Sequence, residues 1–188
     1  TSRIRLGSAV TVLSSDDPIR VYQRFATVDA VSNGRAEVTL GRGSFTESFP
    51  LFGYAMEQYS ALFEEKLDLY AAVLRHDRTG EPISWRGNLR PPLEGQRVFP
   101  RTDHGGLRTR IGVGGSPESV VRAARYHMPL ALAIIGGSPQ RFVPYVDLYR
   151  RALAQFAGPE LPIGVHSPGH IADTDAQARR EFWQPYRE

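Results

Sequence analysis

Short apolar runs alternate along this chain with longer stretches in which apolar residues recur at helical spacing. We interpret five of the runs as apolar strands that end at small or polar residues, which is typical of buried strands. They cover residues 4–13, 36–40, 110–113, 130–135 and 162–165. Helical periodicity predicts helices over residues 18–32, 57–75, 117–126, 140–156 and 173–188. This alternation predicts an α/β protein with a parallel sheet covered on its faces.

The number of strand–helix units decides between the common architectures of parallel α/β proteins. Five units in a chain of 188 residues fit an incomplete (β/α)8 TIM-barrel better than an open sheet. No Gly-x-Gly-x-x-Gly motif follows the first predicted strand, which argues against a dinucleotide-binding fold. We expect one partial barrel domain over residues 1–188, with an irregular insertion at 76–108 and a long loop at 44–56. Short strands are predicted in the insertion near 83–86 and 96–99.

Cap residues mark both ends of the first predicted helix. Asp17 is a preferred N-cap residue, and Pro18 follows it at the first helical position. Asn33 and Gly34 form a left-handed stop at the other end. We therefore interpret Asp16 and Asp17 as a cap and a favourable charge at the helix dipole, not as an acid pair.

Charge and composition argue against several classes of function. The net charge is +3 and the arginines are scattered, with Lys66 as the single lysine, so we expect no nucleic-acid partner. No segment approaches the ~20 apolar residues that span a bilayer, so no membrane association is expected. The chain has no cysteine, which excludes disulfides and a cysteine nucleophile. The N-terminus resembles no signal or transit peptide, so a cytoplasmic location is the default.

The spacing of the histidines does not support a metal site. The histidines are His76, His104, His127, His166 and His170. Only His166 and His170 have a spacing that metal ligands use on a helix, and Pro168 and Gly169 between them break any helix. We therefore expect no metal. His166 stands at a predicted strand end, where it either faces the pocket or has a structural role.

Several motifs occur in an order that a known family shares. Residues 7–53 contain Gly-Ser-Ala in the first strand, a helix started by Asp-Pro, Gly-Arg-Gly after the second strand, and Phe-Gly at the end. The helix FEEKLDLYAAVLR at 63–75, the stretch at 111–153 and the tail at 165–186 follow in turn. On these residues the chain resembles the bacterial luciferase-like flavin monooxygenases, and most of all their FMN-dependent oxidoreductase subgroup.

The resemblance implies an eight-stranded barrel, of which this chain contains only a part. The predicted strands resemble strands three to seven, so the first two strand–helix units and the last one look absent. The active-site histidine of the family lies on the second strand, and we expect the catalytic residue in that missing N-terminal part. We therefore interpret the chain as a fragment or a truncated protein.

The resemblance also implies a flavin site at the carboxyl ends of the strands. A non-prolyl cis peptide bond between Ala9 and Val10 would lie against the flavin ring, where small residues allow a planar group to approach the backbone. Plain strand packing is the alternative. Arg42, flanked by Gly41 and Gly43, would bind the polar edge or the phosphate of the flavin, unless it is a surface arginine in a turn.

A glycine-rich turn is the phosphate site that the resemblance implies. Gly136, Gly137 and Ser138 stand between an apolar strand and a helix, where backbone N–H groups and a hydroxyl bind anions, and Arg141 adds a cation. A helix start capped by Ser138 is the alternative. The turn at 114–116 has the same form, and we interpret it first as a cap of the helix that follows.

The loop at 44–56 carries three aromatic residues with two interpretations. Phe45, Phe49 and Phe52 either cover a flavin ring or substrate pocket, or they anchor the loop to the body of the protein. Anchoring is the more common role of aromatic side chains in a long loop, because they bury large apolar areas.

The resemblance implies a flavin-dependent monooxygenase or oxidoreductase that uses reduced FMN and dioxygen on a small organic substrate. A separate flavin reductase would supply the reduced cofactor, because the sequence has no nicotinamide fingerprint. Hydride transfer with the deazaflavin F420 is the alternative within the family. A non-catalytic partial barrel that pairs with another chain is the alternative outside it. A homodimer is also implied by the resemblance.

Overall fold

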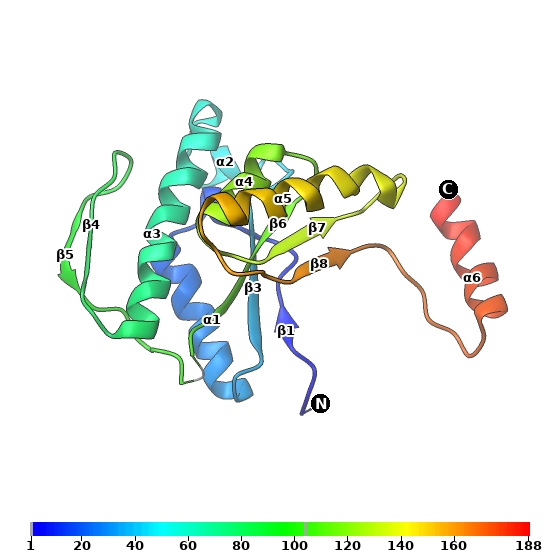
Figure 1. The fold of residues 1–188 in the computed structure, drawn as a ribbon, viewed down its shortest axis with the longest axis horizontal. Helices are drawn as coiled ribbons and strands as arrows, with labels where there is room; N and C mark the ends of the chain where they lie inside the picture. The colour runs from blue at the N-terminus through cyan, green and yellow to red at the C-terminus, as the bar shows by residue number, and fades with distance from the viewer. Residues whose placement is uncertain (1, 104) are drawn as a thin grey trace.

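The computed structural model describes residues 2–103 and 105–188, and its centre is a curved parallel sheet (Figure 1). The strands of this sheet are β1 (Leu6–Gly7), β2 (Thr11–Val12), β3 (Ala36–Gly41), β6 (Arg108–Val113), β7 (Leu130–Ala133) and β8 (Ile163–His166). Their order is β1, β3, β6, β7, β8, with β2 also paired to β3, and each pairing is parallel. This arrangement confirms the predicted partial barrel.

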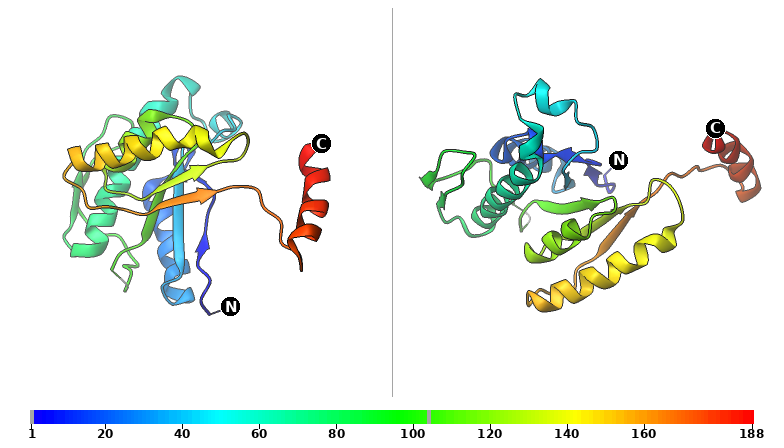
Figure 2. Two further views of the ribbon diagram at one scale, coloured as in Figure 1. Left: turned by 45° about the vertical axis from the view of Figure 1, so that its right-hand side comes forward. Right: turned by 90° about the horizontal axis from the view of Figure 1, so that it is seen from above.

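Helices cover one side of the sheet, as Figure 2 shows. They are α1 (Pro18–Ser32), α3 (Tyr59–Thr79), α4 (Pro117–Arg125) and α5 (Val143–Gln155). The helix α1 packs on β3 and α3, while α4 packs on β6 and α5. The core between helices and sheet contains the fully buried Leu67, Tyr70, Ile111 and Leu130. Burial of this apolar layer is the main favourable contribution to folding.

The other face of the sheet is only partly covered, because buried and accessible residues alternate along the strands. In β3, Ala36, Val38 and Leu40 are fully buried, whereas Glu37 and Thr39 between them are half-buried. The prediction of continuously apolar strands with both faces covered is therefore wrong. Side chains along a barrel strand point alternately outward and inward, and here the inward ones are polar or small.

The first predicted strand is not a buried strand over residues 4–13. Only β1 and β2 of this segment pair with β3, and β1 stands at the end of the strand order. Ile4, Leu6 and Val10 are 61%, 46% and 41% exposed. They are accessible because this segment lies at the edge of the described sheet, where side chains have neighbours on fewer sides.

The predicted insertion at 76–108 begins later than expected. The helix α3 continues to Thr79 instead of ending at Arg75, and Gly80 with a φ of 76° ends it in the left-handed conformation. The insertion is a hairpin of β4 (Ile83–Trp85) and the antiparallel β5 (Leu93–Gln96). The second short strand therefore begins before the predicted range of 96–99 and overlaps it only at Gln96.

Buried polar residues of α3 hold the insertion against the helix. Asp77 accepts hydrogen bonds from the N–H and the hydroxyl of Thr102, both at 2.8 Å, and from the N–H of Leu107 at 3.0 Å. His76 Nε2 accepts from the N–H of Val98 at 3.1 Å. Because both α3 residues are only 2% exposed, these contacts fix the path of the chain into β6.

Other differences from the prediction concern where elements begin and end. The loop at 44–56 contains the short helix α2 (Ser48–Leu51), and the turn η2 (Met56–Gln58) precedes α3. A turn η1 (Leu13–Ser15) follows β2. The strand β7 ends at Ala133, and Ile135 is 62% exposed. The predicted helix over 140–156 is divided into the turn η3 (Pro139–Phe142) and α5.

The last helix, α6 (Asp175–Arg187), stands apart from the body of the protein (Figures 1 and 2). Thr174 caps it, because its hydroxyl accepts from the N–H of Gln177 at 3.2 Å. A contact of 2.7 Å between His170 and Glu181 joins the helix to the extended segment before it. The predicted helix is confirmed, but none of its residues is buried.

Replacing Asp17 by alanine tests the predicted cap of α1. The Asp17 carboxylate accepts from the N–H groups of Ile19 and Arg20 at 2.9 and 3.1 Å. We expect Asp17→Ala to lower the free energy of unfolding by about 1 kcal/mol, because these N–H groups lose their acceptor. Urea unfolding measures the change. Asp147→Ala, on the exposed surface of α5, is the matched control, and an equal loss in both variants would contradict the cap.

Candidate functional site

The carboxyl ends of the parallel strands meet at one edge of the sheet, where barrel enzymes place their sites. At this edge Val10 lies against Gly41 at the end of β3 and against Gly112 in β6. A Cβ atom at Gly41 would lie 2.7 Å from Cγ2 of Val10, and one at Gly112 would lie 2.9 Å from its Cγ1. Glycine is therefore the only residue that fits at either position without moving Val10.

The peptide bond between Ala9 and Val10 is cis, as the resemblance implies. The segment is tied to β3, because the hydroxyl of Ser8 accepts from the N–H of Thr39 at 3.2 Å. Val10 is accessible on its other side. We call the resulting surface the small-residue platform, and it consists of Ala9, Val10, Gly41 and Gly112.

Arg42 follows the platform directly and is half-buried. Its guanidinium carbon lies 5.4 Å from the centre of the Tyr59 ring, which is the range of a cation–π contact. The Tyr59 hydroxyl donates to the carbonyl of Gly43 at 2.6 Å, so the ring is itself held in place. The guanidinium forms no ion pair within the part of the chain that the structure describes. Its donors are therefore available to an anion.

Arg42 lies near the turn before α4, because β3 and β6 are parallel neighbours with Leu40 opposite Ile111, and the turn at 114–116 follows β6 directly. The Ser116 hydroxyl donates to Glu118 at 2.7 Å and lowers the pKa of that carboxyl, and the charges of Arg42 and Arg122 lower it further. The Ser116 oxygen also accepts from the N–H of Ser119 at 3.4 Å, which confirms that the turn at 114–116 caps α4. Arg42 and the turn at 114–116 therefore lie at the ends of two neighbouring strands.

The second glycine-rich turn lies at the end of β7. A Cβ atom at Gly137, whose φ is 77°, would lie 3.0 Å from Nη1 of Arg141, so the guanidinium lies against this turn. Gly136 and Ser138 are exposed. The Ser138 hydroxyl contacts the side chain of Gln140 and does not cap a helix, since the turn η3 comes first. The interpretation of Ser138 as a capping side chain is therefore wrong.

Tyr145 connects the two glycine-rich turns. Its hydroxyl donates to the carbonyl of Gly115 at 2.9 Å, and its ring packs edge-on against Phe142 with 5.8 Å between the ring centres. Arg141 lies about one helical turn before it on the same segment. Both turns therefore border one region, at the ends of the neighbouring strands β6 and β7.

Several other candidate residues lie outside this cluster. Phe49 is fully buried, with its ring centre 5.3 Å from that of Tyr59, so it anchors the loop. Phe45 and Phe52 are instead 80% and 61% exposed. His166 is exposed at the end of β8, and its carbonyl accepts from the N–H of Ile134. His104 lies outside the described residues.

In the part of the chain that the structure describes, neither a metal-ligand cluster nor a membrane-spanning helix is found. Among residues 2–103 and 105–188, no three His, Cys, Asp or Glu side chains gather as metal ligands would. Over the same residues, no helix is both long and apolar enough to cross a bilayer.

Three residues of this region were missed by the sequence analysis. Gly112 lies inside a predicted strand, and a glycine there is a known sign of close backbone approach. Tyr59 and Tyr145 belong to no motif in the sequence. Their contacts with Arg42 and with the turn at 114–116 join segments far apart in sequence, so spacing alone does not indicate them.

The fold and this edge define a parallel βα half-barrel with arginine- and glycine-rich turns at the carboxyl ends of its strands. The profile of one protein family, described as luciferase-like monooxygenase, matches residues 1–188. The chain belongs to this family. The resemblance seen in the sequence motifs is thereby confirmed.

Three solved structures share the fold. Monooxygenase RslO1 from Streptomyces bottropensis has a TM-score of 0.82 and 22% identity, over 100% of this chain and 56% of its own. The oxygenating constituent of 3,6-diketocamphane monooxygenase from Pseudomonas putida, in complex with FMN, has a TM-score of 0.75 and 14% identity, over 96% of this chain and 52% of its own. An F420-dependent secondary alcohol dehydrogenase, in complex with an F420-acetone adduct, has a TM-score of 0.72 and 14% identity, over 95% of this chain and 53% of its own. This chain spans about half the length of each.

Proposed function

We propose that this chain is part of an oxidoreductase that binds a flavin or deazaflavin at the carboxyl edge of its sheet. The observation that carries the proposal is the small-residue platform beside Arg42 and the start of α4. A planar ring needs a surface without protruding side chains, and a phosphate needs cations and N–H donors. Family membership and the solved structures with FMN or F420 support it.

Each part of the cofactor has suitable residues on this chain. The ring would lie against Ala9 and Val10 of the small-residue platform. Arg42 and the N–H groups of the turn at 114–116 would bind the phosphate. The turn at 136–138 with Arg141 is a second candidate for the same group, because it has N–H groups and a guanidinium at the next strand end.

The cofactor supplies the redox chemistry when it is bound, and the protein positions it. Arg42 neutralises and orients the phosphate through a guanidinium that the Tyr59 ring holds in place. Because Gly41 and Gly112 have no side chain, nothing at these two positions protrudes from the platform toward the ring. A small organic substrate would bind on the open side of the ring. A separate reductase would deliver the reduced flavin, and a second copy of the chain is a further proposed partner.

We favour reduced FMN and dioxygen, and hence monooxygenation. Two of the three solved structures are monooxygenases, and one of them holds FMN. Hydride transfer with F420 is the second candidate, favoured by the likeness to the alcohol dehydrogenase.

A titration with FMN and riboflavin tests the proposal. We expect saturable quenching of FMN fluorescence by the 188-residue chain, and affinity at least about tenfold lower for riboflavin, which lacks the phosphate. F420 is titrated in parallel to compare the two cofactors. The absence of saturable binding of either cofactor at millimolar concentration would overturn the proposed function.

A further inference from the structure

A second concave site lies at the opposite edge of the sheet, around the amino ends of the strands. It is a cavity of about 760 Å³, which is within the size range of small-molecule sites. Its lining contains six arginines, namely Arg5, Arg75, Arg78, Arg108, Arg110 and Arg125. We call it the arginine cavity. None of the residues of the proposed flavin site lines it.

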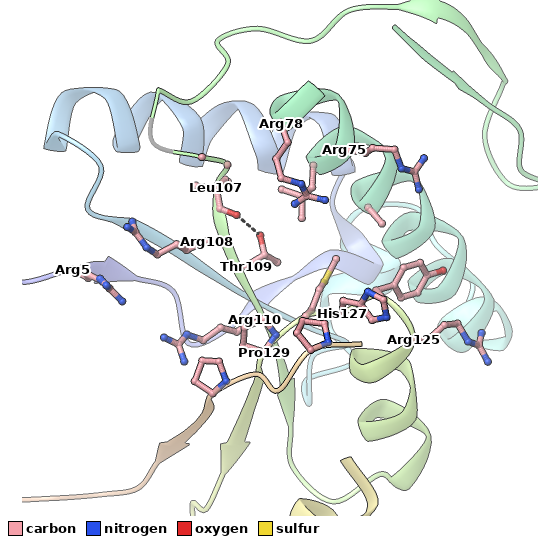
Figure 3. A pocket seen from close by; sticks show the side chains of 18 residues that line it. Arg5, Arg75, Arg78, Leu107, Arg108, Thr109, Arg110, Arg125, His127 and Pro129 are labelled. Carbon is pink, nitrogen blue, oxygen red and sulfur yellow. Dashed lines mark hydrogen bonds between the residues drawn. The ribbon is translucent and has the colours of Figure 1, made fainter. Parts of the chain in front are cut away.

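The arginines of this cavity come from four separate segments of the chain. Arg108 and Arg110 begin β6, while Arg75 and Arg78 lie in the last turns of α3. Arg125 ends α4. Figure 3 shows Arg5, Arg108 and Arg110 on one side of β6, and Arg75 and Arg125 on the other. The fold therefore gathers charges that are scattered in the sequence.

The positive charge of the cavity is only partly neutralised. No acidic residue lines it among the residues that the structure describes. Glu37, just outside the lining, pairs with both Arg5 at 2.8 Å and Arg110 at 3.5 Å, so one carboxylate serves two guanidinium groups. Arg108 donates to the carbonyl of Gly34 at 2.7 Å, which leaves its charge uncompensated.

The other three arginines are free of acidic partners. Arg75, Arg78 and Arg125 form no ion pair within residues 2–103 and 105–188. Each is exposed, so none of them is needed to satisfy a buried group. Clustered guanidinium groups repel one another, and an anion between them removes that repulsion. Their planar forks match phosphate oxygens in two-point contacts.

Apolar and aromatic groups complete the lining. Leu74, Leu107 and Met128 are at most 5% exposed and present apolar surface to the cavity. The Tyr126 ring stands beside them, half-buried. A site for inorganic anions alone would need no such surface. An organic group attached to the anion would bury part of it and gain affinity.

We propose that the arginine cavity binds a phosphorylated small organic molecule with two or more negative charges, such as a nucleoside polyphosphate. The phosphates lie among Arg75, Arg78 and Arg125, and the organic group packs on Leu74, Met128 and Tyr126. This site lies at the edge opposite the proposed flavin site, and it neither uses nor requires that cofactor.

Calorimetric titration of the 188-residue chain with ATP and with inorganic triphosphate tests this proposal. We expect ATP to bind saturably, and inorganic triphosphate to bind more weakly. The double variant Arg78→Gln/Arg125→Gln should weaken ATP binding by about tenfold or more, because two charge-assisted contacts are removed. Arg150→Gln/Arg151→Gln, on the exposed face of α5 and outside the lining, is the charge-matched control and should bind as the parent does.

Thermal melting of each variant shows whether its fold is kept. Neither double substitution should shift the melting temperature, because all four arginines are exposed. Unchanged ATP affinity in Arg78→Gln/Arg125→Gln would overturn the proposed site. An equal loss of affinity in the control variant would also overturn it, because ATP would then be attracted by the net charge of the protein and not by the cavity. Equal affinity for ATP and inorganic triphosphate would overturn the role of the apolar lining. Arg42→Ala should leave ATP binding unchanged. A failure of the ATP proposal can therefore be distinguished from a failure of the proposed flavin site.

Discussion

Arg42→Ala should weaken FMN binding by about tenfold to a hundredfold, corresponding to about 1.5–3 kcal/mol for hydrogen bonds to a charged group. The guanidinium has no ion pair in the described part of the chain, and Arg42 follows β3 beside the end of β6. Its removal therefore takes away phosphate contacts without breaking a structural ion pair. Fluorescence titration with FMN measures the loss.

Two further variants make this prediction specific to the phosphate. Arg42→Lys keeps the charge but loses the planar fork, so its affinity should fall between the parent and Arg42→Ala. Riboflavin binding should change little in either variant, because riboflavin has no phosphate. Thermal stability should fall only slightly, since the contact with Tyr59 is a single cation–π contact.

Arg141→Ala distinguishes the two candidate phosphate sites. If the phosphate lies at Arg42 and the turn at 114–116, Arg141→Ala should bind FMN nearly as the parent does. Unchanged affinity in Arg42→Ala together with a tenfold loss in Arg141→Ala would contradict that placement. The phosphate would then belong to the turn at 136–138, against whose Gly137 the Arg141 guanidinium lies.

The largest expected effect on stability is that of Asp77→Ala, at about 3 kcal/mol. Asp77 is 2% exposed and accepts three hydrogen bonds, from the N–H and hydroxyl of Thr102 and the N–H of Leu107. Alanine leaves these donors without an acceptor in a place that water hardly reaches. Urea unfolding followed by circular dichroism measures the free energy of unfolding.

Asp147→Ala is the control for Asp77→Ala, because Asp147 is exposed on α5. It should change the free energy of unfolding by less than about 0.5 kcal/mol. A loss below about 1 kcal/mol for Asp77→Ala would mean that the chain after the hairpin is held mainly by apolar contacts. The hydrogen bonds of Asp77 would then not determine the path into β6.

Local signals in the sequence were enough for much of the fold. Asp17 accepts hydrogen bonds at the start of α1, and Asn33 ends that helix with a φ of 57°, as their residue types predict. Such caps depend on neighbours within four residues, so they are readable without tertiary information. The order of strands and helices followed from periodicity for the same reason.

Features that depend on contacts between distant segments were not predictable in this way. The strand pattern over residues 4–13 indicates burial, but β1 lies at the sheet edge, where Leu6 has few neighbours. The partly accessible face of β3 depends on curvature, which periodicity does not contain. The arginine cavity is a further case, because Arg5 and Arg125 both line it although the sequence separates them widely.

The candidate flavin site was predictable from the sequence only in part. Arg42 and the turn at 136–138 were indicated by residue type and by the family resemblance, while the cis bond between Ala9 and Val10 was implied by the resemblance alone. The contact of Val10 with Gly112 needed the pairing of β3 with β6, since it joins two strands separated by a long helix and a hairpin.

Hydrogen–deuterium exchange of the 188-residue chain with and without FMN tests most directly whether the carboxyl edge is the cofactor site. We expect slower exchange on FMN binding in the segments 9–12, 41–43 and 112–119, with no change at 105–110 and 125–129 around the arginine cavity. Protection confined to the segments around the arginine cavity, in a sample that binds FMN saturably, would contradict it.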